Sequence, residues 1–316
     1  MRMDYLEIHV PISPRKFFYN RVRYLAKSLR SFGGDLADSK IVVHVGDPSP
    51  PVDLDRLLPW AREEGIEWRW VNKDFFCHWH RTGNPYIATM MNRFSARFNS
   101  KYVIISDADI IFLRDPSSLF SAIKHDLDVA GVMAHVTPFP HDTHIDRWIR
   151  IFNAFDLPPP MMEFEHSGWG VMCEAETSRY SPAYFNSGMM IGTGDAMNRM
   201  APFALPALNA VRSVTDTFFF DQIAFTLMMH KARVNKKLIP IRFNFPNQFG
   251  FEHKYREDAD SICVLHYLRT DIIDRDRIFA SEESIRSFIE RRDLVGSNEE
   301  LRSRVAVIHN MLNGKG

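Results

Sequence analysis

The stretch Tyr102-Val103-Ile104-Ile105-Ser106-Asp107-Ala108-Asp109-Ile110-Ile111-Phe112 decides the interpretation of this sequence. Its apolar residues predict a buried strand that ends in two aspartates, after which the chain becomes apolar again. Because an unpaired buried charge is costly, paired acids at such a place indicate a function and not a contribution to stability. Carboxylate oxygens on one short turn can hold a hard divalent cation, which can bridge the phosphates of a nucleotide. The alternative is a surface turn, where aspartate is common.

The residues before this stretch alternate between strand and helix patterns. The apolar spacing predicts strands at 5–12, 40–45, 67–71 and 101–106 and helices at 17–32, 53–64 and 86–99. This order predicts an α/β fold with a mixed, mostly parallel sheet and helices on both faces. Ligands of such folds bind beyond the carboxyl ends of strands, which is where Asp107 and Asp109 stand.

The rest of the chain divides less regularly. We expect helices from Asp115-Pro116 to about 124 and at 216–231, and strands at 129–134, 184–192, 237–244 and 262–266. Residues 136–182 are rich in Pro, Met, His and Trp without a clear period, which is typical of a lid or binding loop. The tail is polar and helical, and Ser297 and Glu300 predict a capping box. We therefore expect a catalytic domain over 1–280, with 136–182 as an insertion, and a helical extension over 281–316.

Composition narrows the class of protein. Lys+Arg and Asp+Glu are equal at 39 each among 316 residues, so the net charge gives no footprint for nucleic acid. Cys77, Cys173 and Cys263 form neither a disulfide framework nor a zinc pattern, which favours a reducing compartment and three buried thiols. The start of the chain lacks the apolar core of a signal peptide, and no apolar run approaches the ~20 residues that span a bilayer. We expect a cytoplasmic protein, with peripheral membrane contact left open.

Histidines gather in two places and suggest zinc. They are Cys77-His78-Trp79-His80 and, further along, His135, His141 and His144. Their spacing fits no common zinc motif, so packing and loop roles are favoured.

Four motifs in order carry a resemblance to a known family. They are Asp107-Ala108-Asp109, the segment Tyr184-Phe185-Asn186-Ser187-Gly188-Met189-Met190-Ile191-Gly192, the pair Asp221-Gln222, and Val264-Leu265-His266-Tyr267. Together they resemble the DxD-containing, metal-dependent glycosyltransferases of the GT-A fold, in particular the glycogenin and lipopolysaccharide galactosyltransferase group. The resemblance covers roughly Tyr5 to Arg269.

This resemblance implies a set of site residues. It implies a divalent metal, Mn²⁺ or Mg²⁺, bound by Asp107, Asp109 and His266. Mixed oxygen and nitrogen ligands suit Mn²⁺, whereas Mg²⁺ prefers oxygen. Donor-binding residues would be Asp107, Ala108, Asp109, His9 and Arg269, the last in place of a lysine of the family. Catalytic contacts to the sugar would come from Asn186, Asp221 and Gln222. The alternative for Asp221 is a helix N-terminal acid that interacts with the helix dipole.

The implied reaction moves a sugar from a nucleoside diphosphate donor, UDP-sugar by resemblance, to a hydroxyl of a glycan, lipid or protein. The resemblance implies retention of configuration, whereas inversion would need a carboxylate base, for which Glu163, Glu165 and Asp221 are available. Two alternatives stay open. A sugar-nucleotide nucleotidyltransferase would carry a glycine-rich basic loop after the first strand, where this chain has His9-Val10-Pro11-Ile12-Ser13-Pro14. A non-catalytic sugar-nucleotide binding module is the other.

Overall fold

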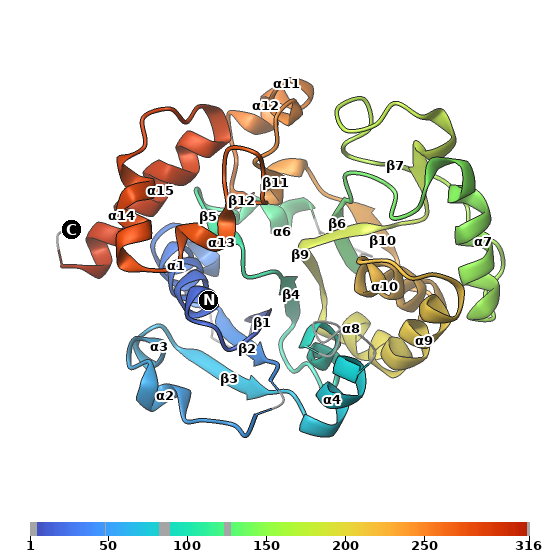
Figure 1. Cartoon of the computed structure of the whole chain (residues 1–316). Helices are drawn as coiled ribbons and strands as arrows, with labels where there is room; N and C mark the ends of the chain where they lie inside the picture. Colours follow the sequence, from blue (N-terminus) through green and yellow to red (C-terminus); the bar gives the residue numbers. More distant parts are fainter. Residues whose placement is uncertain (1–4, 48, 82–88, 123–127, 315–316) are drawn as a thin grey trace.

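A central twisted sheet organises the chain, with helices packed on both of its faces (Figure 1). The structure is a computed structural model, and it describes residues 5–47, 49–81, 89–122 and 128–314. The strand order is β10-β6-β9-β4-β1-β2-β3. These strands are β1 (Leu6–Ile12), β2 (Lys40–Val45), β3 (Ile66–Trp70), β4 (Tyr102–Ser106), β6 (Val129–Met133), β9 (Phe185–Thr193) and β10 (Lys236–Leu238).

The direction of the strands confirms the predicted α/β fold. β1 pairs in parallel with β2 and β4, β2 with β3, and β10 with β6. β9 alone runs antiparallel, between β4 and β6, and makes the sheet mixed. Small sheets flank it: β5 (Ile110–Phe112), β11 (Phe245–Pro246) and β12 (Val264–His266) form one, and β7 (Phe164–Glu165) and β8 (Tyr180–Ser181) another.

Side chains that alternate along the strands pack into two apolar cores, one on each face of the sheet. In β4, Ile104 packs into one core, whereas Val103 and Ile105 pack into the other. The first core is covered by α1 (Lys16–Phe32), α14 (Glu282–Glu290) and α15 (Gly296–Leu312). The second is covered by α7 (His144–Ala154), α8 (Gly194–Met200), α9 (Ala204–Val214) and α10 (Phe220–Lys231).

The C-terminal helices are built into the first core. In Figure 1, α15 lies beside α1. Tyr24 of α1 and His309 of α15 share a hydrogen bond of 2.9 Å between Oη and Nδ1, and Leu301 and Val305 are fully buried there. The division at residue 280 stays a prediction, but buried residues of the tail belong to the first core.

Several expected elements differ in the structure. The helix expected at 53–64 is split into α2 (Leu54–Leu57) and α3 (Trp60–Glu63), because Pro59 disfavours a helical Leu58. The start of the helix expected at 86–99 falls on residues outside the described part of the chain; residues 89–91 are helical, and a 3₁₀ turn follows at Asn92–Phe94. A helix that was not predicted, α4, spans Lys73–Arg81. The remaining short helices are α6 (Ser118–Ala122), α11 (Phe251–Lys254), α12 (Arg256–Ala259) and α13 (Arg275–Ile278).

Two further expectations were wrong for identifiable reasons. Residues 136–182 are not irregular throughout, because α7 buries Trp148, Ile151 and Phe152 at helical spacing. The strand expected at 237–244 ends at Leu238, since Pro240 starts a turn.

The capping box at the last helix is also absent. The Ser297 backbone N–H and hydroxyl both donate to the Glu252 carboxylate, at 2.8 and 2.6 Å, and Glu300 pairs with Arg114. The carboxylate of Glu252, distant in the sequence, therefore accepts the hydrogen bonds at the start of α15. In the part of the chain that is described, no helix has the length and apolar character needed to cross a membrane.

Candidate functional site

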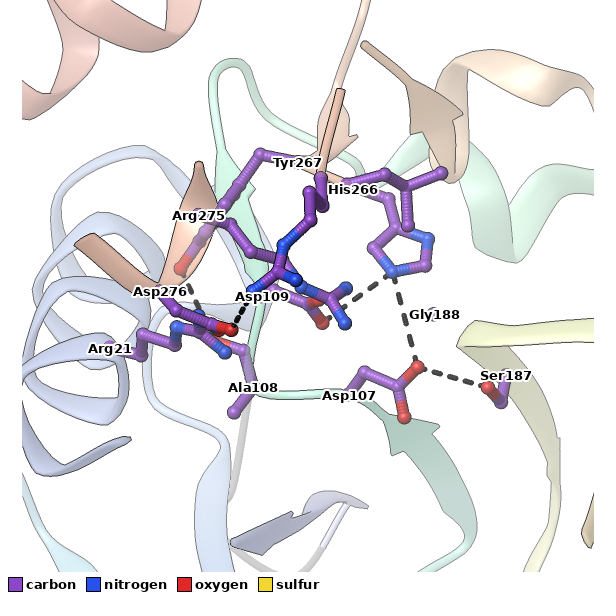
Figure 2. Close-up of polar contacts among 12 residues, drawn as sticks. Arg21, Asp107, Ala108, Asp109, Ser187, Gly188, His266, Tyr267, Arg275 and Asp276 are labelled. Atoms are coloured by element: carbon purple, nitrogen blue, oxygen red, sulfur yellow. Dashed lines mark hydrogen bonds and ion pairs between the residues drawn. The ribbon is translucent and has the colours of Figure 1, made fainter. Parts of the chain in front are cut away.

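The end of β4 and the end of β12 bring three ligand-type side chains together (Figure 2). β5 pairs antiparallel with β12, so His266 lies opposite Ile110. The Tyr267 backbone N–H donates to the Asp109 carbonyl at 2.9 Å, and the Asp107 N–H donates to the Gly188 carbonyl at 3.2 Å. These backbone bonds fix Asp107, Asp109 and His266 on one side of the sheet.

The three side chains form a compact cluster. His266 Nε2 lies 3.9 Å from Asp107 Oδ2 and 3.5 Å from Asp109 Oδ1. One potential ligand atom from each of the three residues lies within 4.8 Å of the others. Both ring nitrogens of His266 are buried and have no hydrogen-bond partner within the described residues. An orphaned imidazole beside two carboxylates fits a divalent cation, so the residues present match the group that the sequence implies.

The two carboxyls have different electrostatics. Burial raises the pKa of Asp107, and the Asp109 carboxylate adds to this shift. Burial also opposes ionisation of Asp109, but its interactions with His266 and with the guanidinium of Arg275 outweigh burial and hold the pKa of Asp109 well below its usual range. Asp109 is therefore the permanently charged member of the cluster.

Arg275 is a site residue that sequence reasoning missed. Its guanidinium donates a very short hydrogen bond to Asp109 Oδ2, and its Nε is buried without a partner among the described residues. Its neighbour Asp276 is held between Arg21 and Arg269. The available signal was the run Asp274-Arg275-Asp276-Arg277 shortly after His266.

Arg269, the predicted phosphate contact, lies elsewhere. Its side chain is 62% exposed and pairs with Asp274 and Asp276. No described contact brings it to Asp107 or Asp109. Its predicted role in donor binding stays a prediction.

The motif around Asn186 forms a rigid turn beside the cluster. Asn186 Oδ1 accepts hydrogen bonds from the Gly188 N–H and from Asn244 Nδ2, both at 2.9 Å. Gln222 Oε1 accepts from the Ser187 N–H at 3.2 Å. The Ser187 hydroxyl donates to Asp107 Oδ2 at 2.9 Å. Both amide oxygens thus serve the turn, which leaves the two NH₂ groups as the atoms that can donate to a ligand.

Asp221 and Arg93 extend this polar region. Asp221 lies in the first turn of α10, where burial and the Asp107 carboxylate raise its pKa to about 6. Arg93 is buried, and burial lowers its pKa to about 10 against the pull of Asp107 and Asp221. Sequence reasoning missed Arg93, although a lone arginine in the run Met90-Met91-Asn92-Arg93-Phe94 was an available signal.

His9 and Ala108 are both buried. His9 stands in the middle of β1, with Nδ1 2.9 Å from His44 Nε2 and Nε2 3.6 Å from a Glu7 carboxylate oxygen. Burial lowers the pKa of His9 and of His44. His9 therefore contacts Glu7 and His44, and no described contact brings it to Asp107 or Asp109. Its role in binding the sugar donor stays a prediction. The Ala108 carbonyl accepts a long bond from the Tyr267 hydroxyl at 3.4 Å.

Comparisons with known proteins identify the family and the fold. A family model described as the Rhodobacterales glycosyltransferase domain matches residues 18–233. A search of curated proteins finds no match. The galactosyltransferase LgtC in complex with donor and acceptor sugar analogues superposes with a TM-score of 0.56 at 14% identity, covering 98% of this chain and 100% of that one. The bifunctional glycosyltransferase WbbM gives a TM-score of 0.55 at 12% identity, covering 100% of this chain and 52% of that one. At such identities the likeness shows a shared GT-A fold.

Proposed function

The chain belongs to the Rhodobacterales glycosyltransferase domain family, and on that premise we propose that it transfers a sugar from a UDP-sugar to a hydroxyl acceptor in a divalent-metal-dependent, retaining reaction. The observation that carries this proposal is the convergence of Asp107, Asp109 and His266 at one edge of the sheet, where the ring nitrogens of His266 have no hydrogen-bond partner among the described residues. The acceptor is a glycan, lipid or protein hydroxyl. Residues 136–182, from β6 to the start of β9, are proposed to shape its site.

Asp107, Asp109 and His266 would hold Mn²⁺ or Mg²⁺. When bound, the ion supplies positive charge that stabilises a leaving nucleoside diphosphate. Mixed oxygen and nitrogen ligands favour Mn²⁺ over Mg²⁺, which prefers oxygen.

Arg275 supplies the second positive charge of the proposed donor site. Its guanidinium already touches Asp109, next to the proposed metal position. A planar guanidinium can donate two hydrogen bonds to a phosphate, which an ammonium cannot do in the same geometry. The Arg21–Asp276 ion pair, with 2.5 Å between Nη2 and Oδ1, anchors the short helix α13 that carries Arg275.

The sugar is proposed to lie against Asn186, Gln222, Asp221 and Arg93. Amide NH₂ groups can donate to sugar hydroxyls without adding charge, and Asp221 can accept from one. Of the carboxylates considered for an inverting reaction, Glu165 is held by Arg179 at 2.9 Å and Lys254 at 3.6 Å. These ion pairs make Glu165 a poor candidate for the base of an inverting reaction, whereas Asp221 remains available, and NMR of the anomeric product would distinguish retention from inversion.

The first experiment measures nucleoside diphosphate release from a panel of donor sugars with Mn²⁺, Mg²⁺ or EDTA. We expect slow, metal-dependent hydrolysis of one donor, and loss of it in Asp107→Asn and Asp109→Asn without unfolding. Asp195→Asn is the matched control, because the Asp195 side chain is 83% exposed on α8. Turnover retained in both site variants would contradict the proposal, whereas binding of a donor without any release would favour the binding module. Release of pyrophosphate from a nucleoside triphosphate with a sugar phosphate would instead reveal a nucleotidyltransferase.

A further inference from the structure

A cysteine, a histidine and a serine meet on the surface of the segment 136–182. The histidine is His141, singled out by the sequence but used by no part of the proposed reaction. Cys173 Sγ lies 3.2 Å from His141 Nε2, and Ser178 Oγ lies 2.6 Å from His141 Nδ1. The sequence predicted a buried thiol, but Cys173 is half-buried. His141 is exposed. A solute can therefore reach the pair.

The hydrogen bonds of this cluster assign its protons. The Ser178 hydroxyl has one proton and donates it to the Ala175 carbonyl at 3.2 Å. With that assignment, Nδ1 of His141 donates in the 2.6 Å contact to Ser178 Oγ, and the lone pair of Nε2 faces the thiol proton of Cys173. The Ala175 backbone N–H also donates to Cys173 Sγ at 3.3 Å, which stabilises negative charge on the sulfur.

This arrangement is held in place from several sides. Thr177 Oγ1 donates to the His141 carbonyl at 3.2 Å, and the Gly170 N–H donates to the Cys173 carbonyl at 2.8 Å. Ser178 is buried beneath the histidine. A nucleophile in contact with a base, which a third group orients, is the geometry that activates thiols in proteins.

We propose that Cys173 is a reactive thiol and that the Cys173–His141–Ser178 cluster is a site of reversible modification by low-molecular-weight disulfides. The thiol proton moves to His141 Nε2, and the thiolate attacks one sulfur of the disulfide. The bond from Sγ to that sulfur forms as the original S–S bond breaks, and the leaving thiolate takes the proton from His141. Cys173 is thereby oxidised to a mixed disulfide and the small molecule is reduced to one thiol. This site does not depend on the proposed glycosyl transfer.

The other two cysteines are internal controls. Cys77 on α4 is also half-buried, so it reports the reactivity of an accessible thiol. Cys263 is buried, its thiol donates to the Ser261 carbonyl at 3.5 Å, and burial raises its pKa. It should be the slowest of the three.

The test treats the full chain at pH 7 with limiting 4,4′-dithiodipyridine, a neutral disulfide, and follows each cysteine by peptide mass spectrometry. We expect Cys173 to react about tenfold faster than Cys77, as a base-assisted thiol does. His141→Asn should abolish this advantage, Ser178→Ala should reduce it, and His253→Asn, at an exposed histidine, should leave it unchanged. Equal rates at Cys173 and Cys77 in the unmodified protein would overturn the proposal, as would an unchanged rate in a folded His141→Asn variant. The comparison of wild-type cysteines stands even if that variant does not fold.

Discussion

Arg275 donates a hydrogen bond to the carboxylate of Asp109 across 166 positions of the chain. Asp109 thus faces His266 and Asp107 on one side and a guanidinium on the other (Figure 2). A cation at the proposed metal site would share this carboxylate with the guanidinium of Arg275, and the two positive charges would suit a diphosphate. In that proposal, α13 is coupled to the donor site.

Replacing Arg275 separates its role from that of Arg269. We expect Arg275→Met to raise the donor KM roughly 10–100-fold, since a hydrogen bond to a charged group contributes about 1.5–3 kcal/mol. Arg269→Met, at the 62% exposed position, should change the donor KM no more than about twofold. Steady-state kinetics against the donor decides between them. A larger effect at Arg269 would restore the sequence-based assignment.

The substitution Gly188→Ala should disable the cluster by a steric route. A Cβ at this position would lie 2.3 Å from His266 Nδ1 and 2.5 Å from Asn244 Oδ1, so the imidazole must move. We expect Mn²⁺ affinity, measured by calorimetry, to fall by about 10–100-fold, as it does when ligand orientation is lost.

Gly170→Ala is the control for that experiment. Gly170 has a φ of +78° but no atom near its added Cβ, so the change reports backbone strain alone. It should cost about 1 kcal/mol of stability and leave Mn²⁺ binding unchanged. Equal metal affinity in Gly188→Ala and wild type would contradict the tight fit at His266.

The raised pKa of Asp221 predicts a pH dependence of stability. Burial and the Asp107 carboxylate bring this pKa to about 6 in the folded state, above its value of about 3.9 in the unfolded chain. The folded state therefore binds more protons between about pH 4 and 6, and stability falls as pH rises through this window. Asp221→Asn should be more stable than wild type at pH 8 and equally stable near pH 4.

Urea denaturation with EDTA across this range tests the prediction, since EDTA removes the influence of metal on Asp107. A stability difference that does not change with pH would show that Asp221 is not the group that titrates. Activity should also fall below about pH 6 if the sugar contact needs the ionised carboxylate.

The packing of α15 predicts that the tail is part of the folding unit. Leu301 is fully buried against the first core, so Leu301→Ala should lower the free energy of unfolding by about 2–5 kcal/mol. Val307 on the same helix is 42% exposed, and Val307→Ala should cost less than about 0.5 kcal/mol. A single cooperative transition, shifted as a whole by Leu301→Ala, is expected in urea. Separate unfolding of the tail would support an independent extension.

Local patterns foretold much of the fold because they act over a few residues. The apolar strand before Asp107 and the spacing of Val22, Leu25 and Leu29 on α1 each bury one face, and that requirement is written in neighbouring positions. The helix α7 was not predicted, because its helical period lies within a segment rich in Pro, His and Trp. Its residues Trp148, Ile151 and Phe152 are nevertheless all buried. Breaks such as the one before Pro59 depend on single residues within an otherwise helical pattern.

The sequence by itself determined the α/β order and the paired aspartates at the end of a strand, because these depend on short-range hydrophobic periodicity and on residue chemistry, whereas the choice of His266 came from the resemblance to the family. Only the tertiary structure decided which arginine contacts Asp109, since Arg275 begins α13 and reaches that carboxylate, whereas Arg269 precedes α13 and pairs with Asp276. It also joined Cys173 to His141, and Arg93 to the carboxylates. Such contacts are set by strand register and by helix packing over long separations, which no local pattern encodes.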